Sequence, residues 1–162
     1  MLYPLPAVLI TCADKEGHEN VFTVAWAGTV CTNPPMVSIS VRPERFSHGM
    51  IMETKEFVIN LTTEDLAYAV DFCGVRSGRD VDKFEICKLT REKASKVKAP
   101  LLAEVVAVHA EEAFMDTNKR FRLKQARPLA YSHGEYYGLG KQLGTFGYSV
   151  KKSSNGKKRR KR

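Results

Sequence analysis

Short runs of alternating apolar and polar residues constrain the fold of this chain more than any other feature. The clearest run is Met36-Val37-Ser38-Ile39-Ser40-Val41, whose period of two is typical of a half-buried strand. Comparable runs bounded by turn residues predict strands at residues 7–12, 20–28, 36–41, 56–61, 103–111, 129–131 and 135–139. The short connections favour a mainly β fold, a small barrel of mostly antiparallel strands with a few helices at its ends.

Two helices are expected among these strands. Ser47 has the type and place of a residue that caps a short helix over residues 48–54. Thr62, with Asp65 three residues later, resembles a capping box and predicts a second helix through about residue 73, closed by Gly74.

The positive charge of the chain is concentrated at its end. Eight of the 26 Lys and Arg residues lie in the last twelve, KKSSNGKKRRKR, so residues 1–150 hold 18 basic and 18 acidic residues. This distribution predicts one domain over residues 1–150 and a basic, disordered tail over residues 151–162. Because the body is neutral and the tail has no aromatic residue, nucleic-acid binding through the tail is the weakest functional alternative.

The composition predicts a cytoplasmic protein without membrane contact. No apolar run approaches the ~20 residues that span a bilayer, and the first residues lack the basic region and cleavage site of a signal peptide. The widely spaced Cys12, Cys31, Cys73 and Cys87 predict buried, reduced thiols, and no metal site is expected from four scattered histidines.

Three stretches contain residue types that bind a phosphate. They are residues 42–47, with Arg45 and Ser47; residues 77–80, with Ser77, Gly78 and Arg79; and Lys83. Small residues and helix starts offer free backbone N–H groups, while Arg and Lys supply positive charge. Each stretch alone also fits an ordinary solvated loop, and no catalytic motif accompanies them.

The strand that carries Trp26, the only tryptophan, is followed by an unusual stretch. Gly28, Thr29, Val30, Cys31 and Thr32 lead into Asn33 and two prolines, which predicts an interrupted strand. From the residues alone, the interruption fits either a β-bulge or a place where the backbone approaches a ligand. Trp26 by itself fits a core position.

Most of the chain resembles a known family. The resemblance rests on the runs NVFTVAWAGTVCTNPPMVSISVRPERFSHGMI, EFVINLTTEDLAYAVDFCGVRSGRDVDKFE, EVVAVHAEE and PLAYSHGEYYGLGKQLGTFGYSVKK. Together they are similar to the flavin reductase-like, FMN-binding split-barrel family, of the flavoredoxin type.

The resemblance implies a homodimer of six-stranded barrels that bind FMN near the subunit interface. The positions that match the family's FMN contacts are Asn20, Trp26, Ser47, Lys83, His109 and Phe146. Ser47, the loop of Ser77, Gly78 and Arg79, and Lys83 match its phosphate side. With the resemblance, residues 28–32 are expected to contact the edge of the flavin ring.

One departure from the family is visible. Relatives carry some two dozen further residues between Leu102 and Ala103, a stretch that forms a strand and the hairpin after it. A barrel without that strand is expected to expose two unpaired edges unless neighbouring elements or a partner subunit cover them.

The resemblance implies a flavin-dependent oxidoreductase that passes hydride from NADH or NADPH to flavin. The alternative is an FMN-bound electron carrier without a nicotinamide site. In either case the cofactor supplies the chemistry, so no residue is predicted to be catalytic.

Overall fold

The computed structural model describes residues 2–93, 102–145 and 148–150. The strands are β1 (Leu5–Pro6), β2 (Val8–Ala13), β3 (Glu19–Val24), β4 (Ala27–Thr32), β5 (Pro35–Ile39), β6 (Val58–Leu61), β7 (Leu102–Glu104), β8 (Leu129–Ser132) and β9 (Glu135–Gly138). The α-helices are α1 (Phe46–Thr54), α2 (Ala67–Val75) and α3 (Lys83–Ile86), and four single 3₁₀ turns lie at Glu64–Leu66, Glu112–Phe114, Leu123–Ala126 and Tyr148–Val150. The predicted class, mainly β with a few helices, is therefore confirmed.

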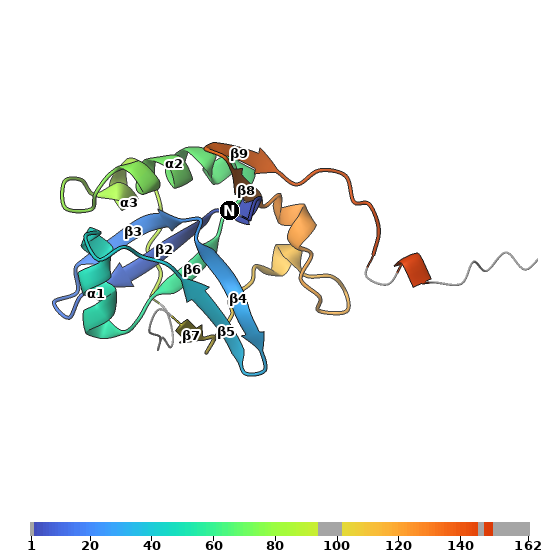
Figure 1. Cartoon of the computed structure of the whole chain (residues 1–162), viewed down its shortest axis with the longest axis horizontal. Helices are drawn as coiled ribbons and strands as arrows, with labels where there is room; N and C mark the ends of the chain where they lie inside the picture. Colours follow the sequence, from blue (N-terminus) through green and yellow to red (C-terminus); the bar gives the residue numbers. More distant parts are fainter. Residues whose placement is uncertain (1, 94–101, 146–147, 151–162) are drawn as a thin grey trace, which may run out of the picture.

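The strands form three small sheets (Figure 1). Their orders are β3-β2-β6, β4-β5-β7 and β1-β8-β9, and every pairing is antiparallel. Within the described residues the sheets do not close into a barrel. Both β6 and β7 stand at sheet edges, so each has one side without a strand partner among the described residues.

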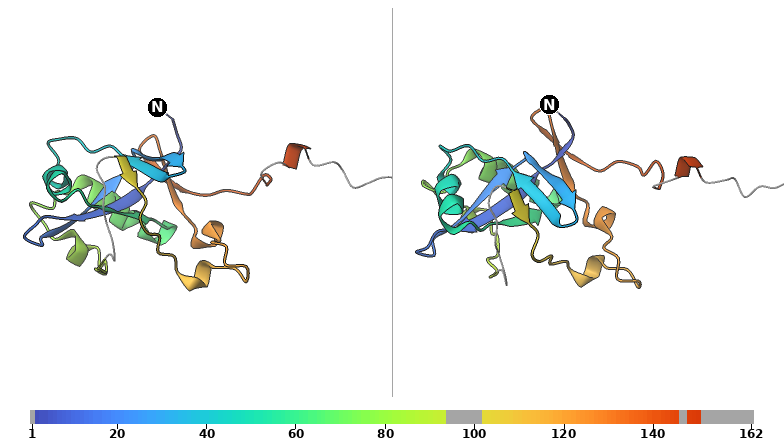
Figure 2. Two further views of the ribbon diagram at one scale, coloured as in Figure 1. Left: turned by 90° about the horizontal axis from the view of Figure 1, so that it is seen from below. Right: turned by 60° about the horizontal axis from the view of Figure 1, so that its bottom comes forward.

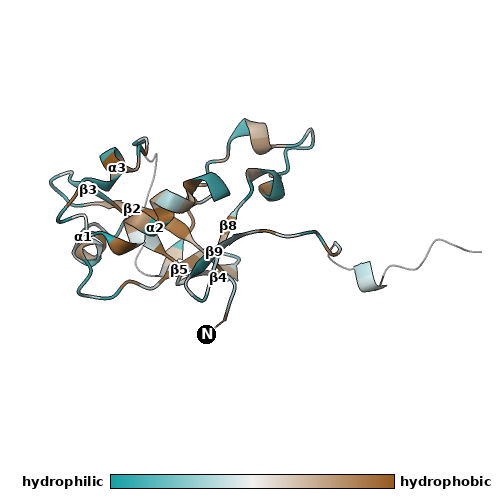
Figure 3. Ribbon diagram, turned by 90° about the horizontal axis from the view of Figure 1, so that it is seen from above, coloured by the Kyte–Doolittle hydropathy of each residue, from teal (hydrophilic) through white to brown (hydrophobic). Residues whose placement is uncertain are grey.

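The β3-β2-β6 sheet is buried on both faces. Val8, Ile10 and Cys12 of β2 point to one face, where they pack with residues of β5, α1 and β7. Ala7 and Leu9 belong to the other face and pack with α2, α3 and Leu129. Because successive side chains of a strand point to opposite faces, β2 supplies both halves of the core. Figure 3 shows hydrophobic residues gathering at the centre of the body, where β2, α2 and β5 lie.

The break after β3 lies earlier than predicted. The expected strand over residues 20–28 ends at Val24, where its partner β2 begins at Val8, so the ladder has no further partner. After a bend at Ala25 and Trp26, β4 starts a new ladder with β5. The prediction that the strand breaks over residues 28–33 is therefore wrong. A register shift between Thr29 and Cys31 disturbs β4, in agreement with the alternative of a β-bulge.

The predicted strand over residues 103–111 is only partly present. Strand β7 ends at Glu104, which pairs with Met36 of β5, and Val105 N–H still donates to Pro35 O at 2.8 Å. Beyond Pro35 the β4–β5 hairpin turns at Asn33 and Pro34 and offers no further strand residue for pairing. Residues 105–110 therefore have no regular secondary structure.

Both helix starts differ from the expectation. Helix α1 begins at Phe46 with Arg45 at its N-cap, and Ser47 makes no cap. The Thr62 hydroxyl donates to Ala7 O at 2.5 Å and does not cap a helix. A 3₁₀ turn with Thr63 at its N-cap precedes α2. Helix α2 runs through Gly74, whose missing side chain lets it pack on Thr23: an added Cβ would lie 3.3 Å from the Cβ of Thr23.

No helix in the described ranges has the length and apolar character needed to cross a bilayer. Residues 139–145 lead away from the body in both views of Figure 2. The predicted tail, residues 151–162, and Phe146 lie outside the described residues, so the predictions for them stand as made.

Candidate functional site

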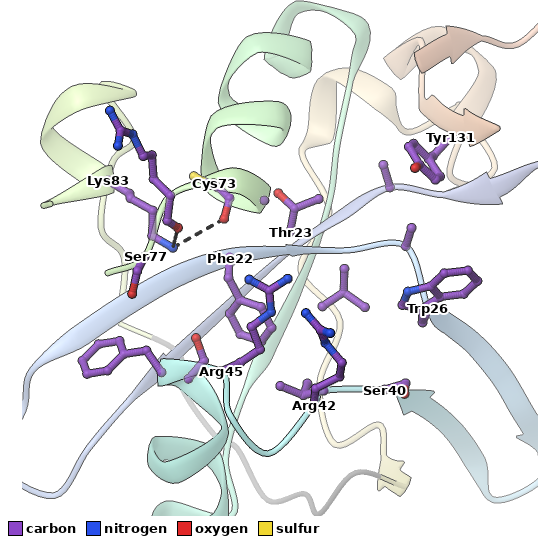
Figure 4. A pocket seen from close by; sticks show the side chains of 18 of the residues that line it. Phe22, Thr23, Trp26, Ser40, Arg42, Arg45, Cys73, Ser77, Lys83 and Tyr131 are labelled. Atoms are coloured by element: carbon purple, nitrogen blue, oxygen red, sulfur yellow. Dashed lines mark hydrogen bonds between the residues drawn. The ribbon is translucent and has the colours of Figure 1, made fainter. Parts of the chain in front are cut away.

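A pocket of about 570 Å³ lies beside β3, where the loop before α1, the end of α2, Lys83 and strands β8 and β9 meet (Figure 4). Its lining residues are Ala7, Phe22, Thr23, Val24, Ala25, Trp26, Ser40, Val41, Arg42, Arg45, Phe46, Ser47, Cys73, Gly74, Arg76, Ser77, Lys83, Tyr131 and Tyr136. This volume is in the ordinary range for a small-molecule site, ~300–1,000 Å³. The lining includes four basic residues and no acidic one.

Lys83 occupies one end of the pocket. Its position is set by Asp82, the N-cap of α3, which accepts hydrogen bonds from the N–H groups of Phe84 and Glu85. The Lys83 residue is only 3% exposed, and burial lowers the pKa of its ammonium group below the ordinary value.

The Lys83 Nζ donates to Cys73 O at 3.5 Å and to Arg76 O at 3.4 Å, as the dashed lines in Figure 4 show. These distances are long for N–H···O bonds. None of the ion pairs found among the described residues supplies a carboxylate to Lys83. An anion in the pocket would therefore meet a buried cation that has only weak acceptors in the protein.

Ser47 is held next to this end by a buried partner. Asn20 Nδ2 donates to Ser47 Oγ at 2.6 Å, and the two residues are 4% and 2% exposed. A hydroxyl that accepts from Asn20 keeps its own proton to donate to a ligand in the pocket.

The three residues of the predicted loop, Ser77, Gly78 and Arg79, contact different parts of the protein. Ser77 lines the pocket, and its Oγ accepts a hydrogen bond from Arg79 N at 3.2 Å. Gly78 packs on Asn20, because a Cβ there would lie 2.1 Å from Asn20 Oδ1. The Arg79 guanidinium lies 5.6 Å from the ring centre of Phe46. Gly78 and Arg79 thus do not belong to the lining.

The predicted flavin-edge stretch lies elsewhere in this chain. The residues of this stretch all belong to β4, and none lines the pocket. Gly28, Thr29, Cys31 and Thr32 pair with β5, whereas Val30 lies at the register shift and has no partner in the ladder. The stretch thus keeps its ladder pairing except at Val30, and its contact with the flavin edge stays a prediction.

Trp26 lines the opposite end of the pocket. It is 48% exposed, so its interpretation as a core residue is wrong. Its ring centre lies 6.5 Å from that of Tyr3, which in turn lies 6.1 Å from that of Tyr131. The ring centres of Tyr131 and Tyr136 lie 5.5 Å apart, so the aromatic rings form a continuous wall.

Three other predicted residues are not found in the lining. Asn20 is buried and is joined to the lining only through its hydrogen bond to Ser47. His109 is exposed and lies in the irregular segment after β7. Phe146 lies outside the described residues. Because β7 ends at Glu104, His109 is not part of a strand.

Sequence reasoning missed several lining residues. Arg42 belongs to the predicted phosphate-binding stretch of residues 42–47, but the prediction names only Arg45 and Ser47 from that stretch. Arg76 directly precedes the predicted loop at Ser77. No local signal identifies Tyr131 and Tyr136, because they reach the pocket only through the pairing of β8 with β1 and β9.

The four cysteines are free thiols. Cys12 and Cys73 are buried as predicted, whereas Cys31 and Cys87 are only half-buried. Burial raises the pKa of Cys12 to about 11 and that of Cys73 to about 12, so both stay protonated at neutral pH.

Asp14, Glu16 and His18 gather at the turn between β2 and β3, with one potential ligand atom each within 4.8 Å of the others. His18 is hydrogen-bonded to Asp14 through Nδ1 at 2.9 Å, and Glu16 is exposed. Exposed groups of this kind are common in turns, and these three do not line the pocket.

Two curated relatives illustrate the sequence similarity. An uncharacterized protein of Archaeoglobus fulgidus is 32% identical over 106 residues, covering 65% of this chain and 59% of that protein. An uncharacterized protein of Aquifex aeolicus is 24% identical over 166 residues and 85% of each chain is covered. The match therefore spans less than two thirds of the length of the Archaeoglobus protein.

Solved structures share the fold. Flavoredoxin of Desulfovibrio vulgaris superposes with a TM-score of 0.87 at 24% identity, covering 93% of this chain and 95% of that one. A flavoredoxin from Methanosarcina acetivorans superposes with a TM-score of 0.77 at 22% identity, covering 93% of this chain and 95% of that one. A putative flavin reductase with a split barrel domain from Shewanella frigidimarina superposes with a TM-score of 0.75 at 22% identity, covering 88% of this chain and 85% of that one.

The TM-scores of these superpositions show that the chain has the split-barrel fold. The family follows from a separate finding: the sequence pattern described as flavin reductase like domain matches residues 1–111. Because that match covers well over half of the chain, the protein belongs to the flavin reductase-like domain family.

Proposed function

We propose that the pocket binds FMN and that the protein transfers electrons through it. The observation that carries this proposal is the buried Lys83 ammonium, which faces a pocket with four basic residues in its lining and no acidic one. A phosphate dianion supplies the charge and the acceptor atoms that this end lacks.

Lys83, Ser47 and Ser77 would hold the phosphate, with Arg45 and Arg76 nearby. Arginine and lysine side chains together with serine hydroxyls are the usual donors to phosphate oxygens. The aromatic wall at Trp26, Tyr131 and Tyr136 would lie along the flat ring system. The residues present therefore fit both parts of FMN.

When bound, FMN supplies the redox chemistry, and the chain binds and orients it. NADH or NADPH is the proposed hydride donor. Support comes from the family, and from the structural neighbour of Shewanella frigidimarina, which is described as a putative flavin reductase.

The alternative is an FMN-bound electron carrier without a nicotinamide site. It is favoured by the superposition on flavoredoxin of Desulfovibrio vulgaris, at a TM-score of 0.87. The two functions differ in one observable, reduction of the bound flavin by a nicotinamide nucleotide.

The test has two steps. Trp26 is the only tryptophan and lines the pocket, so FMN uptake should quench its fluorescence; a preparation that shows neither quenching nor flavin absorbance would overturn FMN binding. NADH or NADPH is then added without oxygen. Bleaching of the flavin absorbance supports the reductase, and its absence, with reduction by dithionite intact, supports the electron carrier.

A homodimer is also part of the proposal. Strands β6 and β7 are sheet edges, and the segment after β7 exposes Val106 and Val108, the latter by 82%. Exposed apolar residues beside unpaired edges favour association with a second copy. Analytical ultracentrifugation should give the mass of a dimer. The variant Val108→Lys should shift the equilibrium toward the monomer. A wild-type protein that is monomeric at micromolar concentration would overturn the proposed homodimer.

A further inference from the structure

A basic lobe, residues 112–127, lies between β7 and β8 in the sequence. Figure 1 shows it in yellow-orange and orange at the edge of the body, on the side away from α1 and α3. The rest of residues 1–150 holds 13 basic and 16 acidic residues, so the lobe concentrates the positive charge of the body. Its basic residues are Lys119, Arg120, Arg122, Lys124 and Arg127, and its acidic residues are Glu112 and Asp116.

Most of the basic side chains of the lobe have no acidic partner within the described ranges. Lys119, Arg120, Arg122 and Lys124 are exposed, and none of them belongs to an ion pair found there. The fifth, Arg127, is paired with Glu64. Because the four unpaired cations lie close together in the chain, they repel one another, and an anionic partner would relieve that repulsion.

Hydrogen bonds fix the backbone of the turn that carries these cations. Asp116 Oδ1 accepts from Asn118 N at 2.9 Å and from Arg120 N at 2.8 Å, and Asp116 N donates to Arg120 O at 3.0 Å. Arg122 N donates to Phe114 O at 2.7 Å. The Asp116 carboxylate thus binds the backbone and not the basic side chains. A backbone that is ordered in advance lowers the entropy cost of binding a partner.

The lobe fits a protein better than a nucleic acid. Single strands stack their bases on exposed aromatic rings, but Phe121, the one exposed aromatic residue of the lobe, packs edge to face on Phe114 with ring centres 6.5 Å apart. Four unpaired cations also fall short of the ~6–10 phosphate contacts of duplex binding. Half-exposed apolar residues among cations, here Phe121 and Leu123, are instead typical of protein contacts with a polar rim.

We propose that the basic lobe docks a partner protein through a carboxylate-rich face of that partner. Arginine binds a carboxylate through two parallel N–H groups, and lysine adds positive charge. Strand β8 follows the lobe, and its Tyr131 lines the pocket; at most ~14 Å of extended chain separates Arg127 from Tyr131, so the partner would dock beside the pocket. The inference goes beyond the proposed function, because docking on the lobe does not require FMN.

The experiment compares two anionic probes with the same number of charges. Poly-L-glutamate represents a carboxylate-rich protein face, and single-stranded poly-dT represents a nucleic acid. The full-length protein is titrated into each dye-labelled probe at low salt, and binding is followed by fluorescence anisotropy. Poly-L-glutamate should bind, and its affinity should fall as salt is added, because salt screens exposed charges.

A triple variant of the lobe assigns the binding to this surface. Arg120→Gln/Arg122→Gln/Lys124→Gln should weaken poly-L-glutamate binding about tenfold, because three exposed contacts between opposite charges are lost. The same variant should bind poly-dT within about twofold of the wild type, because the basic tail supplies that binding. Its FMN affinity should not change, because none of the three residues lines the pocket.

A second triple variant removes the same charge outside the lobe. Lys55, Lys88 and Lys141 are exposed and have no ion-pair partner among the described residues. Lys55→Gln/Lys88→Gln/Lys141→Gln should therefore weaken poly-L-glutamate binding by about twofold or less, the effect of a lower net charge alone.

Four results would overturn the docking proposal. They are no binding of poly-L-glutamate at low salt, equal losses in the two triple variants, a larger loss for poly-dT than for poly-L-glutamate in the lobe variant, and dissociation of a wild-type dimer by the lobe variant. The third would make the lobe a nucleic-acid site, and the fourth would show that a second copy covers it. Failure of the protein to take up FMN would overturn the proposed function and leave the docking proposal intact.

Discussion

Asn20 Nδ2 donates a buried hydrogen bond of 2.6 Å to Ser47 Oγ, across 27 positions of sequence. The bond joins β3 to the first turn of α1, and Gly78 packs on the same asparagine from the loop after α2. Asn20 therefore fixes the relative positions of the segments that form the proposed phosphate end of the pocket.

Asn20→Ala should destabilise the protein by about 1–3 kcal/mol, because it removes a buried hydrogen bond and leaves polar neighbours without it. Chemical denaturation measures the free energy of unfolding. Asn118→Ala is the matched control: Asn118 is exposed, and only its backbone N–H is hydrogen-bonded, to Asp116. Equal losses for the two variants would show that the Asn20 bond contributes little.

Gly78→Ala should also destabilise the protein, by about 1–3 kcal/mol, the usual scale of overpacking. An added Cβ would lie 2.1 Å from Asn20 Oδ1, and the bond to Ser47 keeps Asn20 from moving away. In the double variant Asn20→Ala/Gly78→Ala the clash is gone, so its cost should be clearly smaller than the sum of the single costs. Strict additivity would contradict this packing.

Lys83→Ala should weaken FMN binding by about 1.5–3 kcal/mol, the scale of a hydrogen bond to a charged group. Riboflavin, which lacks the phosphate, should lose far less affinity. Fluorescence titration measures both ligands, with Lys124→Ala as a control at an exposed position. If both ligands lost the same affinity, Lys83 would contact some other part of the flavin.

Raising the pH above 9 should destabilise the fold through Cys12. Burial raises the pKa of its thiol from 9.0 to about 11, so the folded state holds the proton more tightly than the unfolded state. The contribution to stability is complete below pH 9 and is lost as the pH rises toward 11, by about 1.3 kcal/mol between pH 8 and pH 10.

The check is urea denaturation at pH 8, 9 and 10 for the wild type and for Cys12→Val, a substitution of similar volume. The variant should show a smaller decline over this range, because it lacks the titrating thiol. Parallel declines would assign the pH dependence to other groups.

Deletion of residues 153–162 should leave FMN affinity and flavin reduction unchanged. The segment has six basic residues and no apolar one, so ordering it would cost ~1–2 kcal/mol per residue in backbone entropy without burial in return. Weak binding of polyanions, measured at low and high salt, should fall on deletion. Loss of flavin binding or of the proposed dimer would show that the tail is structural.

Local patterns in the sequence determined much of the fold. Alternation located β2, β5, β6, β8 and β9 to within two residues, because the period-two pattern follows from a sheet with differing faces. Charge and residue size likewise identified Arg45, Ser47, Ser77 and Lys83, four residues that line the pocket.

The ends of strands and the joining of distant residues were decided by the tertiary structure alone. Strand β3 ends at Val24 because its partner β2 begins at Val8. Strand β7 ends at Glu104 because its partner β5 begins at Pro35. Neither end can be predicted from the residues of the strand itself. Tyr131 meets the pocket for the same reason: it pairs with Leu5, 126 positions earlier. A strand needs a partner for its backbone hydrogen bonds, and which partner is in reach depends on the path of the whole chain.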